Sequence, residues 1–346
     1  MELTIIWVGK MKLNLTLNDI NDVFEKIRKE YKIYAPVKKE FKGTMSDTPS
    51  IRYDEVQNFN EIEFNEKSDF SAKEIILPIT QVLFNFNENE YSEPTRSQEK
   101  ILLFVRACDI NGIRSLDLMY QNNGPKDKYY IQARERITFV LIGCEKSFRN
   151  CFCVSMGSNK TENYALGFKP AGDNVYLEVK DESFSKYFDT PTDNNFNFEM
   201  DFVSENNEVV NLPVIKDTKI VSELETWREY DSRCIGCGKC NFVCPTCSCF
   251  AMQDIYYKEN ENVGERRRVW ASCQIEGYSD MAGGHSFRKK NGDKMRFKAL
   301  HKVHDFKQRF GEHMCTGCGR CSDACPSYIS FSATINKLDK AIKELK

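Results

Sequence analysis

The chain has 346 residues, of which 41% are hydrophobic, and its formal net charge is −2. This length allows about two domains with ordinary buried cores. A net charge near zero argues against a dedicated nucleic-acid-binding protein, because such proteins are usually strongly basic. No apolar run approaches the ~18 residues needed to span a bilayer, and the N-terminal LTIIWVG (3–9) is too short for a signal-peptide core. We therefore expect a cytoplasmic protein that binds neither nucleic acid nor membranes.

The first part of the chain shows one helical pattern followed by strand-like segments. Residues 18–32 carry apolar side chains at helical spacing, with Asn18 as the candidate N-cap. The segments 74–84 and 100–109 are apolar and rich in β-branched residues, so we expect buried strands or strand–turn segments. Residues 136–144 predict a stronger strand. Since 100–109 and 136–144 both run into a cysteine, they suggest a sheet whose edge presents thiols.

The next segments predict a hairpin, a polar connection and a terminal helix. Residues 164–180 alternate between apolar and polar side chains, which predicts a hairpin with its turn at 171–174. From 181 to 230 the composition becomes polar, and 190–199 has the composition of a loop, so we place a domain boundary near residue 225. The last residues, 333–346, have the pattern of an amphipathic helix.

The chain contains fifteen cysteines, and their clustering indicates metal binding. Disulfides do not explain such a number in a cytosolic protein, because the cytosol keeps thiols reduced. The count is also odd, so at least one thiol would stay unpaired. All but four of the cysteines lie between Cys234 and Cys325.

Two runs of the form C-x2-C-x2-C-x3-C-P begin at Cys234 and Cys315, and this run is the bacterial ferredoxin signature for [4Fe–4S] clusters. Three closely spaced thiolates curl round one cube, while nearby glycines let the backbone approach. In two-cluster ferredoxins the fourth cysteine of each run serves the other cluster. The first predicted cube is held by Cys234, Cys237, Cys240 and Cys325. The second is held by Cys315, Cys318, Cys321 and Cys244.

Structural zinc is the alternative interpretation of these runs, since zinc sites also use C-x2-C pairs. Zinc takes four ligands in two pairs, however, whereas the chain has two identical runs of four that end in Cys-Pro. Iron is therefore the better assignment. A zinc-stabilised interaction scaffold remains as a hypothesis from a different class of function.

Three further cysteines, Cys247, Cys249 and Cys273, fit no ferredoxin rule. Buried free cysteines are common as small hydrophobic residues. A redox role, or a role as extra metal ligands, is the alternative that the sequence leaves open.

Four N-terminal thiols predict a third [4Fe–4S] cluster. Cys108 and Cys144 follow the two predicted strands, whose adjacent ends would bring them together. Cys151 and Cys153 follow closely, and a Cys-x-Cys pair places both thiols on one side of an extended segment. Buried structural cysteines are the alternative, and Asp109 could replace one thiol as a ligand.

The segment 265–309 between the two cysteine runs is basic, with twelve Lys and Arg against five acidic residues, a local net charge of +7. Thiolate-bound cubes are anionic, so part of this charge is expected to balance them. Part could also dock an acidic partner, and a solvated basic face is the alternative. His301, His304 and His313 lie nearby, but imidazole ligands are exceptional for such cubes.

Several ordered motifs resemble the iron–sulfur electron-transfer protein of anaerobic sulfite reductase and the related β subunit of cytosolic sulfhydrogenases. They are SAKEIILPITQVLF, FVRACDINGIRSLD, CFCVSMGS, CPTCSCF and HKVHDFKQRFGEHMCTGCGRC, and they cover most of the chain from about residue 70 onward. The resemblance implies an electron-transfer subunit. Such a subunit takes electrons from a flavin- and NAD-binding partner and passes them to a sirohaem subunit that reduces sulfite to sulfide.

The residues themselves agree with an electron-transfer role. No glycine-rich dinucleotide fingerprint follows a strand, and no nucleophile with an evident base stands out, so we predict no catalytic residues and no substrate site in this chain. We expect a mixed α/β (or α+β) N-terminal domain over residues 1–225, with the third cluster. A dicluster ferredoxin-like domain should follow over 226–346. The leading hypothesis is a subunit of an oxidoreductase complex, anaerobic sulfite reductase, and the alternative is the β subunit of a nickel–iron (sulf)hydrogenase.

Overall fold

The computed structural model describes residues 11–43, 45, 47–188, 197–257 and 260–345. The apolar stretch 3–9 and most of the predicted loop 190–199 lie outside the described residues. The described strands are β1 (Met11–Thr16), β2 (Tyr31–Lys39), β3 (Ser50–Glu55), β4 (Thr80–Phe86), β5 (Tyr91–Ser92), β6 (Lys100–Val105), β7 (Ile137–Ile142), β8 (Leu166–Ala171), β9 (Asn174–Val179), β10 (Phe250–Tyr257) and β11 (Asn260–Trp270).

The described α-helices are α1 (Leu17–Ile27), α2 (Lys73–Ile76), α3 (Ala107–Gln121), α4 (Lys128–Arg134), α5 (Thr218–Ser222), α6 (Glu229–Arg233), α7 (Lys239–Phe242), α8 (Asn291–Leu300), α9 (Phe306–Phe310), α10 (Arg320–Asp323) and α11 (Phe331–Glu344). Short 3-10 helices are η1 (Phe59–Glu61), η2 (Glu182–Tyr187) and η3 (Glu225–Arg228), and η4 (His301–Asp305) is a π-helical turn.

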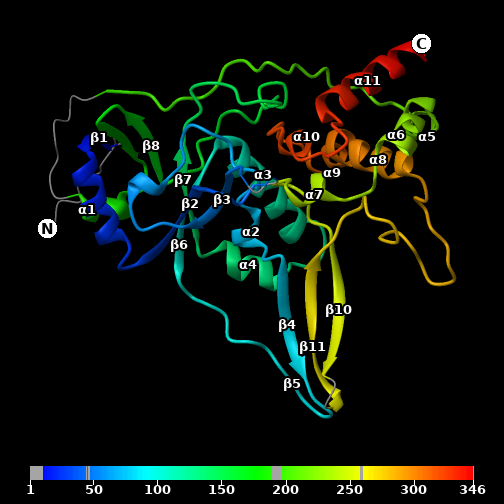
Figure 1. The fold of residues 1–346 in the computed structure, drawn as a ribbon, viewed down its shortest axis with the longest axis horizontal. Helices are drawn as coiled ribbons and strands as arrows, with labels where there is room; N and C mark the ends of the chain where they lie inside the picture. Colours follow the sequence, from blue (N-terminus) through cyan, green and yellow to red (C-terminus); the bar gives the residue numbers. More distant parts are fainter. Residues whose placement is uncertain (1–10, 44, 46, 189–196, 258–259, 346) are drawn as a thin grey trace, which may run out of the picture.

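A seven-stranded mixed sheet forms the centre of the N-terminal region, in the order β1-β9-β8-β7-β6-β2-β3. Strands β2, β6, β7 and β8 run parallel, and antiparallel strands complete both edges. Side chains alternate between two buried cores, since Leu102 and Phe104 face one core while Leu103 and Val105 face the other. Helix α1 covers the first face, and α3 covers the second (Figure 1). The predicted mixed α/β class is confirmed.

The C-terminal region forms a helical layer at the other end of the molecule, where α5 to α11 gather (Figure 1). Its core is built on Trp227, Met295 and Ile335. Val210 and Val221 also pack into this core, although both precede the predicted boundary at residue 225. The domain boundary stays a prediction, and residues 210–221 pack with the C-terminal side.

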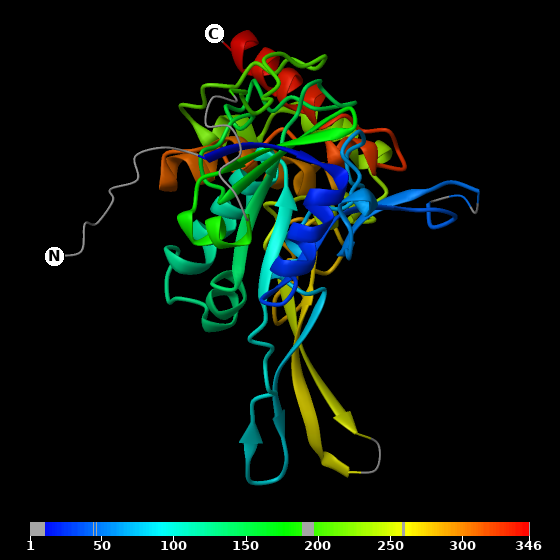
Figure 2. The ribbon, with the colours of Figure 1, turned by 90° about the vertical axis from the view of Figure 1, so that its left-hand side faces the viewer.

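A four-stranded arm projects from the body, in the order β10-β11-β4-β5 (Figures 1 and 2). Strand β4 comes from the N-terminal region and pairs antiparallel with β11 from the C-terminal region, with Val82 opposite Arg267. The two regions therefore share a sheet as well as packed side chains.

The structure corrects the first predicted helix. Helix α1 begins at Leu17 and ends at Ile27, and Tyr31 already opens β2. The N-cap is Thr16 rather than Asn18, because the Thr16 hydroxyl accepts from the Asp19 backbone N–H and the Asp19 carboxylate accepts from the Thr16 N–H.

Other predictions fared better. Residues 74–84 contain α2 before β4, so only their second half is a strand, and 100–109 contain β6 followed by the start of α3. The strand at 136–144 is confirmed as β7, and the hairpin at 164–180 is confirmed as β8 and β9. The predicted C-terminal helix is confirmed as α11.

One buried ion pair joins the two regions of the chain. The Arg320 guanidinium donates to both carboxylate oxygens of Asp109, at 2.6 and 2.8 Å, and to the backbone oxygen and hydroxyl of Ser68. Both members of the pair are almost fully buried. Such a pair fixes geometry because either charge alone would be costly.

Arg320→Met should lower the free energy of unfolding by about 3–5 kcal/mol, because the Asp109 carboxylate would stay buried without its partner. Anaerobic denaturant unfolding measures this change. Arg266→Met is the matched control, since Arg266 pairs with Asp254 at the exposed edge of the arm. Equal effects of the two substitutions would contradict the role of the buried pair.

Candidate iron–sulfur centres

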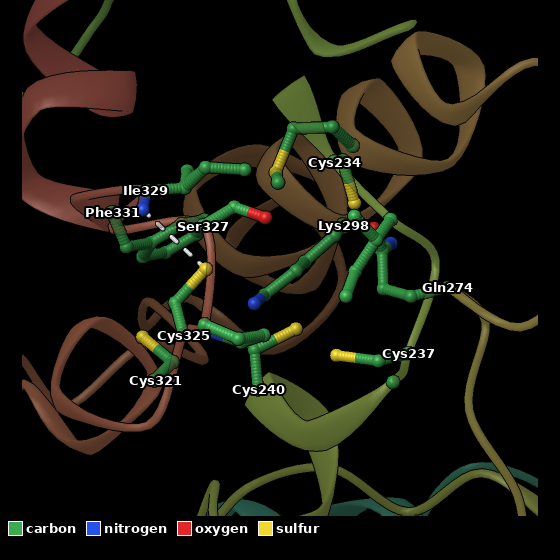
Figure 3. A pocket seen from close by; sticks show the side chains of 14 residues that line it. Cys234, Cys237, Cys240, Gln274, Lys298, Cys321, Cys325, Ser327, Ile329 and Phe331 are labelled. Atoms are coloured by element: carbon green, nitrogen blue, oxygen red, sulfur yellow. Dashed lines mark hydrogen bonds between the residues drawn. The ribbon is translucent and has the colours of Figure 1, made fainter. Parts of the chain in front are cut away.

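The first centre is a cavity in the helical layer that gathers thiols from both cysteine runs. Figure 3 shows the Lys298 side chain reaching between these thiols. The cavity is lined by all four thiols predicted for the first cube: Cys234, Cys237, Cys240 and Cys325. The crossed ligand is thus placed with the distant run, as the ferredoxin rule expects.

The second centre is a neighbouring cavity. It is lined by the four thiols predicted for the second cube: Cys244, Cys315, Cys318 and Cys321. Cys321 and Lys298 line both cavities, so a single layer of side chains separates the two centres. Phe152, from the N-terminal region, also lines the second cavity.

Backbone N–H groups point at several of these sulfurs. The Gly236 N–H donates to Cys234 Sγ at 3.5 Å, the Gly317 N–H to Cys315 Sγ at 3.4 Å, and the Ile329 N–H to Cys325 Sγ at 3.4 Å. Hydrogen bonds to sulfur stabilise the thiolate form that binds iron and tune the potential of a bound cluster. The donor set therefore fits a thiolate-ligated cluster.

Glycines of the second run allow close backbone packing against the N-terminal cysteine loop. A Cβ atom at Gly317 would lie 2.6 Å from the carbonyl carbon of Phe152, and one at Gly319 would lie 2.3 Å from the Asn150 carbonyl oxygen. Both glycines have a left-handed backbone, with φ of 63° and 75°. The second centre and the loop around Cys151 are therefore fitted to each other.

Two buried lysines supply positive charge to the thiols. Lys298 and Lys302 are both nearly inaccessible to solvent. Burial alone would lower the pKa of Lys298, but the charges of Cys240 and Cys321 raise it well above its usual value. The pKa of Lys302 is likewise raised, against its burial, by Cys244, Cys247 and Cys315. Both lysines stay charged and compensate the anionic sulfur atoms.

The rest of the basic segment is spread over other surroundings. Arg266 pairs with Asp254 at the surface, and Arg268 pairs with Asp127. Burial and the neighbouring Lys302 lower the pKa of His301 to about 4, so its imidazole is neutral at physiological pH. Only part of the predicted charge thus faces the centres.

The four N-terminal thiols lie at the carboxyl ends of two neighbouring parallel strands. Cys108 is in the first turn of α3, directly after β6, and Cys144 follows β7. Cys151 and Cys153 are buried in the loop that follows. The predicted convergence of the strand ends is therefore present in the fold.

The charges of these thiols act on one another, as expected for a compact group. Burial, together with the charges of Cys151, Cys144 and Cys318, raises the pKa of Cys153 to about 12. Burial also raises the pKa of Cys108 well above its usual value, and Cys153 is among the neighbours that add to this shift. Four mutually close, buried thiols suit a metal cage better than separate packing positions.

Positive and polar groups surround these four thiols. Arg106 donates to Cys144 Sγ at 3.4 Å, and Lys67 to Cys151 Sγ at 3.6 Å. Asn206 Nδ2 donates to Cys153 Sγ at 3.7 Å. Asp109, the alternative ligand, has both oxygens engaged by Arg320. The set of four cysteines thus fits an anionic cluster without a carboxylate ligand.

The three remaining thiols, Cys247, Cys249 and Cys273, line a separate cavity next to the second centre. They do not line either of the two ferredoxin-type cavities among the described residues. Their grouping could not be anticipated from spacing, since Cys273 follows the long hairpin of β10 and β11.

Residues 233–329 match a family model described as a 4Fe-4S dicluster domain. This part of the chain is a 4Fe–4S dicluster domain. It binds [4Fe–4S] clusters, and the zinc hypothesis has no comparable support. The predicted ferredoxin-like C-terminal domain is thereby confirmed.

The chain is also similar to sulfhydrogenase 2 subunit beta of Pyrococcus furiosus, with 25% identity over 335 residues. The alignment covers 93% of this chain and 96% of that relative. No solved structure matches the chain significantly. Within the described ranges, no helix combines the length and apolar character needed to cross a membrane.

Sequence reasoning missed the cations that serve the N-terminal thiols. Lys67, Arg106 and Arg320 come from three distant segments, and no local pattern marks them. A signal did exist for Lys298 and Lys302, which stand four residues apart in the basic segment and so lie on one helical face.

Cys244→Ser should alter the paramagnetic signal of the cube held mainly by Cys315, Cys318 and Cys321, because the Cys244 thiol lines that cavity. Electron paramagnetic resonance of the reduced protein makes the comparison. Cys325→Ser is the reciprocal variant and should alter the other cube. If each substitution changed only the cube held by its own run, the crossed arrangement would be wrong.

Proposed function

We propose that this chain is the iron–sulfur electron-transfer subunit of a multi-subunit oxidoreductase. The observation that carries the proposal is a row of three thiol groups that runs from the N-terminal sheet to the molecular surface. When bound, the clusters supply one-electron redox chemistry. The residues of the chain hold them, bury them and compensate their charge.

The proposed ligand sets follow the geometry described above. The first cube takes Cys234, Cys237, Cys240 and Cys325. The second takes Cys244, Cys315, Cys318 and Cys321. The third takes Cys108, Cys144, Cys151 and Cys153.

Direct contacts link the three groups in this order. The Cys151 thiol donates a hydrogen bond to the Cys318 carbonyl oxygen at 3.3 Å, which joins the third group to the second. Cys321 and Lys298 line both the second and the first cavity. The row therefore needs no bridging element between its stations.

The first group is the end of the row that reaches the surface. Cys237 is exposed, and two apolar side chains beside the first run are exposed as well, Ile235 by 66% and Tyr328 by 85%. An electron carrier that docks here would bring its own redox centre close to the first cube. We assign this face to a redox partner subunit.

The identity of the complex rests on the relative and on the motifs. The similarity to sulfhydrogenase 2 subunit beta covers nearly the whole chain and favours the hydrogenase alternative over the leading hypothesis of sulfite reductase. In the first case the partners are a flavin- and NAD-binding protein together with a nickel–iron protein. In the second, a sirohaem protein replaces the nickel–iron protein.

Anaerobic affinity purification of the tagged full chain from its native cells, with identification of the bound subunits, tests this proposal. Recovery of a flavoprotein together with a nickel–iron protein supports the hydrogenase complex. Recovery of a sirohaem protein supports sulfite reductase. A cluster-containing chain that purifies alone at native expression level would contradict its role within a complex.

The isolated, cluster-loaded chain should neither oxidise NADH nor reduce sulfite, because the proposed row carries electrons between partners. Steady-state assays with each substrate and an artificial electron carrier measure both reactions. Appreciable turnover in either assay would show that the chain has a flavin or sirohaem site of its own.

Ile235→Glu should slow electron exchange with the partner complex at least about tenfold while leaving the iron content unchanged, because a charge would be desolvated at the apolar docking face. Stopped-flow reduction by the purified partner measures the rate. Tyr91→Glu is the matched control on the projecting arm, where Tyr91 is 76% exposed. Equal slowing by both variants would contradict the docking assignment.

A further inference from the structure

A cavity of about 390 Å³ lies beside the second centre and differs from the two cluster cavities in size. Those two cavities measure only about 30 and 20 Å³, because their thiols close round a small space. A volume of 390 Å³ falls in the range of small-molecule sites, roughly 300–1,000 Å³. The cavity is therefore shaped for a ligand rather than for a cube.

Two of its three cysteines form a hydrogen-bonded pair. Cys249 and Cys273 stand just beyond the paired ends of β10 and β11, where Phe250 lies opposite Trp270 and the Ala271 N–H donates to the Cys249 carbonyl oxygen at 3.0 Å. The Cys273 thiol donates a hydrogen bond to the Cys249 sulfur. The ladder of β10 and β11 thus holds the two sulfurs together.

The two sulfurs have unlike surroundings. Cys273 is buried behind the cavity wall, where Asn241 Nδ2 donates to its sulfur at 3.0 Å. Cys249 is half-buried and also accepts a hydrogen bond from the Tyr278 hydroxyl. Donation from Cys273 lowers the pKa of Cys249 to about 6 and raises that of Cys273. An accessible thiolate backed by a buried thiol is the arrangement of a nucleophilic and a resolving cysteine.

The cavity is in contact with the second centre. Lys298 and Lys302 line both the cavity and the space that holds Cys315, Cys318 and Cys321. Cys247 lines the cavity, and its thiol donates a hydrogen bond to the sulfur of Cys244, a proposed ligand of the second cube. Electrons that reach this cube are therefore one side chain away from the cavity.

The lining of the cavity indicates the charge of its ligand. Arg288, Lys298 and Lys302 contribute positive charge, and none of the described residues that line it is acidic. Phe250, Tyr278 and Phe297 supply aromatic walls. The site suits a small molecule with an organic body and an anionic group.

We propose that Cys249 and Cys273 form a redox-active dithiol that reduces a small organic disulfide carrying carboxylate or other anionic groups. The proposal rests on the proposed function, since the electrons come one at a time through the second cube from a low-potential iron–sulfur donor. It adds a substrate site to a chain that would otherwise only relay electrons.

The chemistry balances in three steps. The Cys249 thiolate attacks one sulfur of the substrate disulfide RSSR, which breaks that S–S bond, forms a Cys249–SR mixed disulfide and releases RS⁻, which takes a proton from water. The Cys273 thiol then attacks the Cys249 sulfur, forms the Cys249–Cys273 disulfide and gives its proton to the departing RSH. Two electrons and one proton restore the Cys249 thiolate and the Cys273 thiol. The sum is RSSR + 2e⁻ + 2H⁺ → 2RSH.

The first test traps the mixed disulfide on the full-length, cluster-loaded chain under anaerobic conditions. In Cys273→Ser, treatment with 3,3′-dithiodipropionate should leave a mercaptopropionate adduct on Cys249, detected by mass spectrometry after acid quench. Cys249→Ser should carry no adduct in this cavity, and iron content and visible spectrum should be unchanged in both variants. Absence of the Cys249 adduct, or loss of about four irons per chain in Cys273→Ser, would overturn the proposal.

The second test uses charge. The dianionic 3,3′-dithiodipropionate should react at Cys249 at least about tenfold faster than dicationic cystamine, which has a similar length, at low ionic strength. Arg288→Gln should reduce this preference. Equal rates for the two disulfides would overturn the anionic substrate class.

The third test concerns the electrons. In photoreduced protein, the paramagnetic signal of the second cube should decay when 3,3′-dithiodipropionate is added, and should persist in Cys249→Ser. A signal that persists in the unsubstituted chain would overturn the link to the cube. Adduct formation on Cys249 requires no electron transfer, so failure of the trapping test and failure of the proposed electron-transfer role give different results.

Discussion

The structure depends on the burial of negatively charged sulfur next to fixed positive charge. Iron-bound thiolates are anionic, and an isolated buried charge is costly. Lys298 and Lys302 answer this requirement in the helical layer, and Lys67 and Arg106 answer it at the N-terminal thiols. The same lysines are buried only because sulfur atoms keep them charged. Cluster binding and local folding are therefore coupled in this chain.

That constraint explains why the two regions are fitted so closely. The second cysteine run packs its glycine backbone against residues 150–153, and the Phe152 N–H donates to the Gly317 carbonyl oxygen at 2.8 Å. Arg320 continues the contact by binding Asp109 and Ser68. Strand pairing between β4 and β11 joins the regions a second time. The row of thiol groups thus crosses a rigid junction, which keeps its stations at fixed separations.

The parts that sequence predicted are those encoded in local spacing. The crossed sets of four thiols follow from the x2-x2-x3 pattern, and the hairpin of β8 and β9 follows from alternation and a Gly-Asp turn. The start of α1 was displaced because Thr16 outcompeted Asn18 as cap. The strand pairing of β4 with β11, and the meeting of Cys249 with Cys273, depend on contacts between segments far apart in sequence. No local pattern carries that information, so the arm and the third cavity required the fold.

The central claim is that this chain carries three four-iron cubes in a row, the third of them on the N-terminal sheet. Iron and acid-labile sulfide analysis of the anaerobically purified full chain tests it most directly. The account predicts about twelve irons per chain, from three four-iron cubes, falling to about eight in a Cys144→Ser/Cys151→Ser variant. About eight irons in the fully reconstituted chain, unchanged by those substitutions, would contradict it.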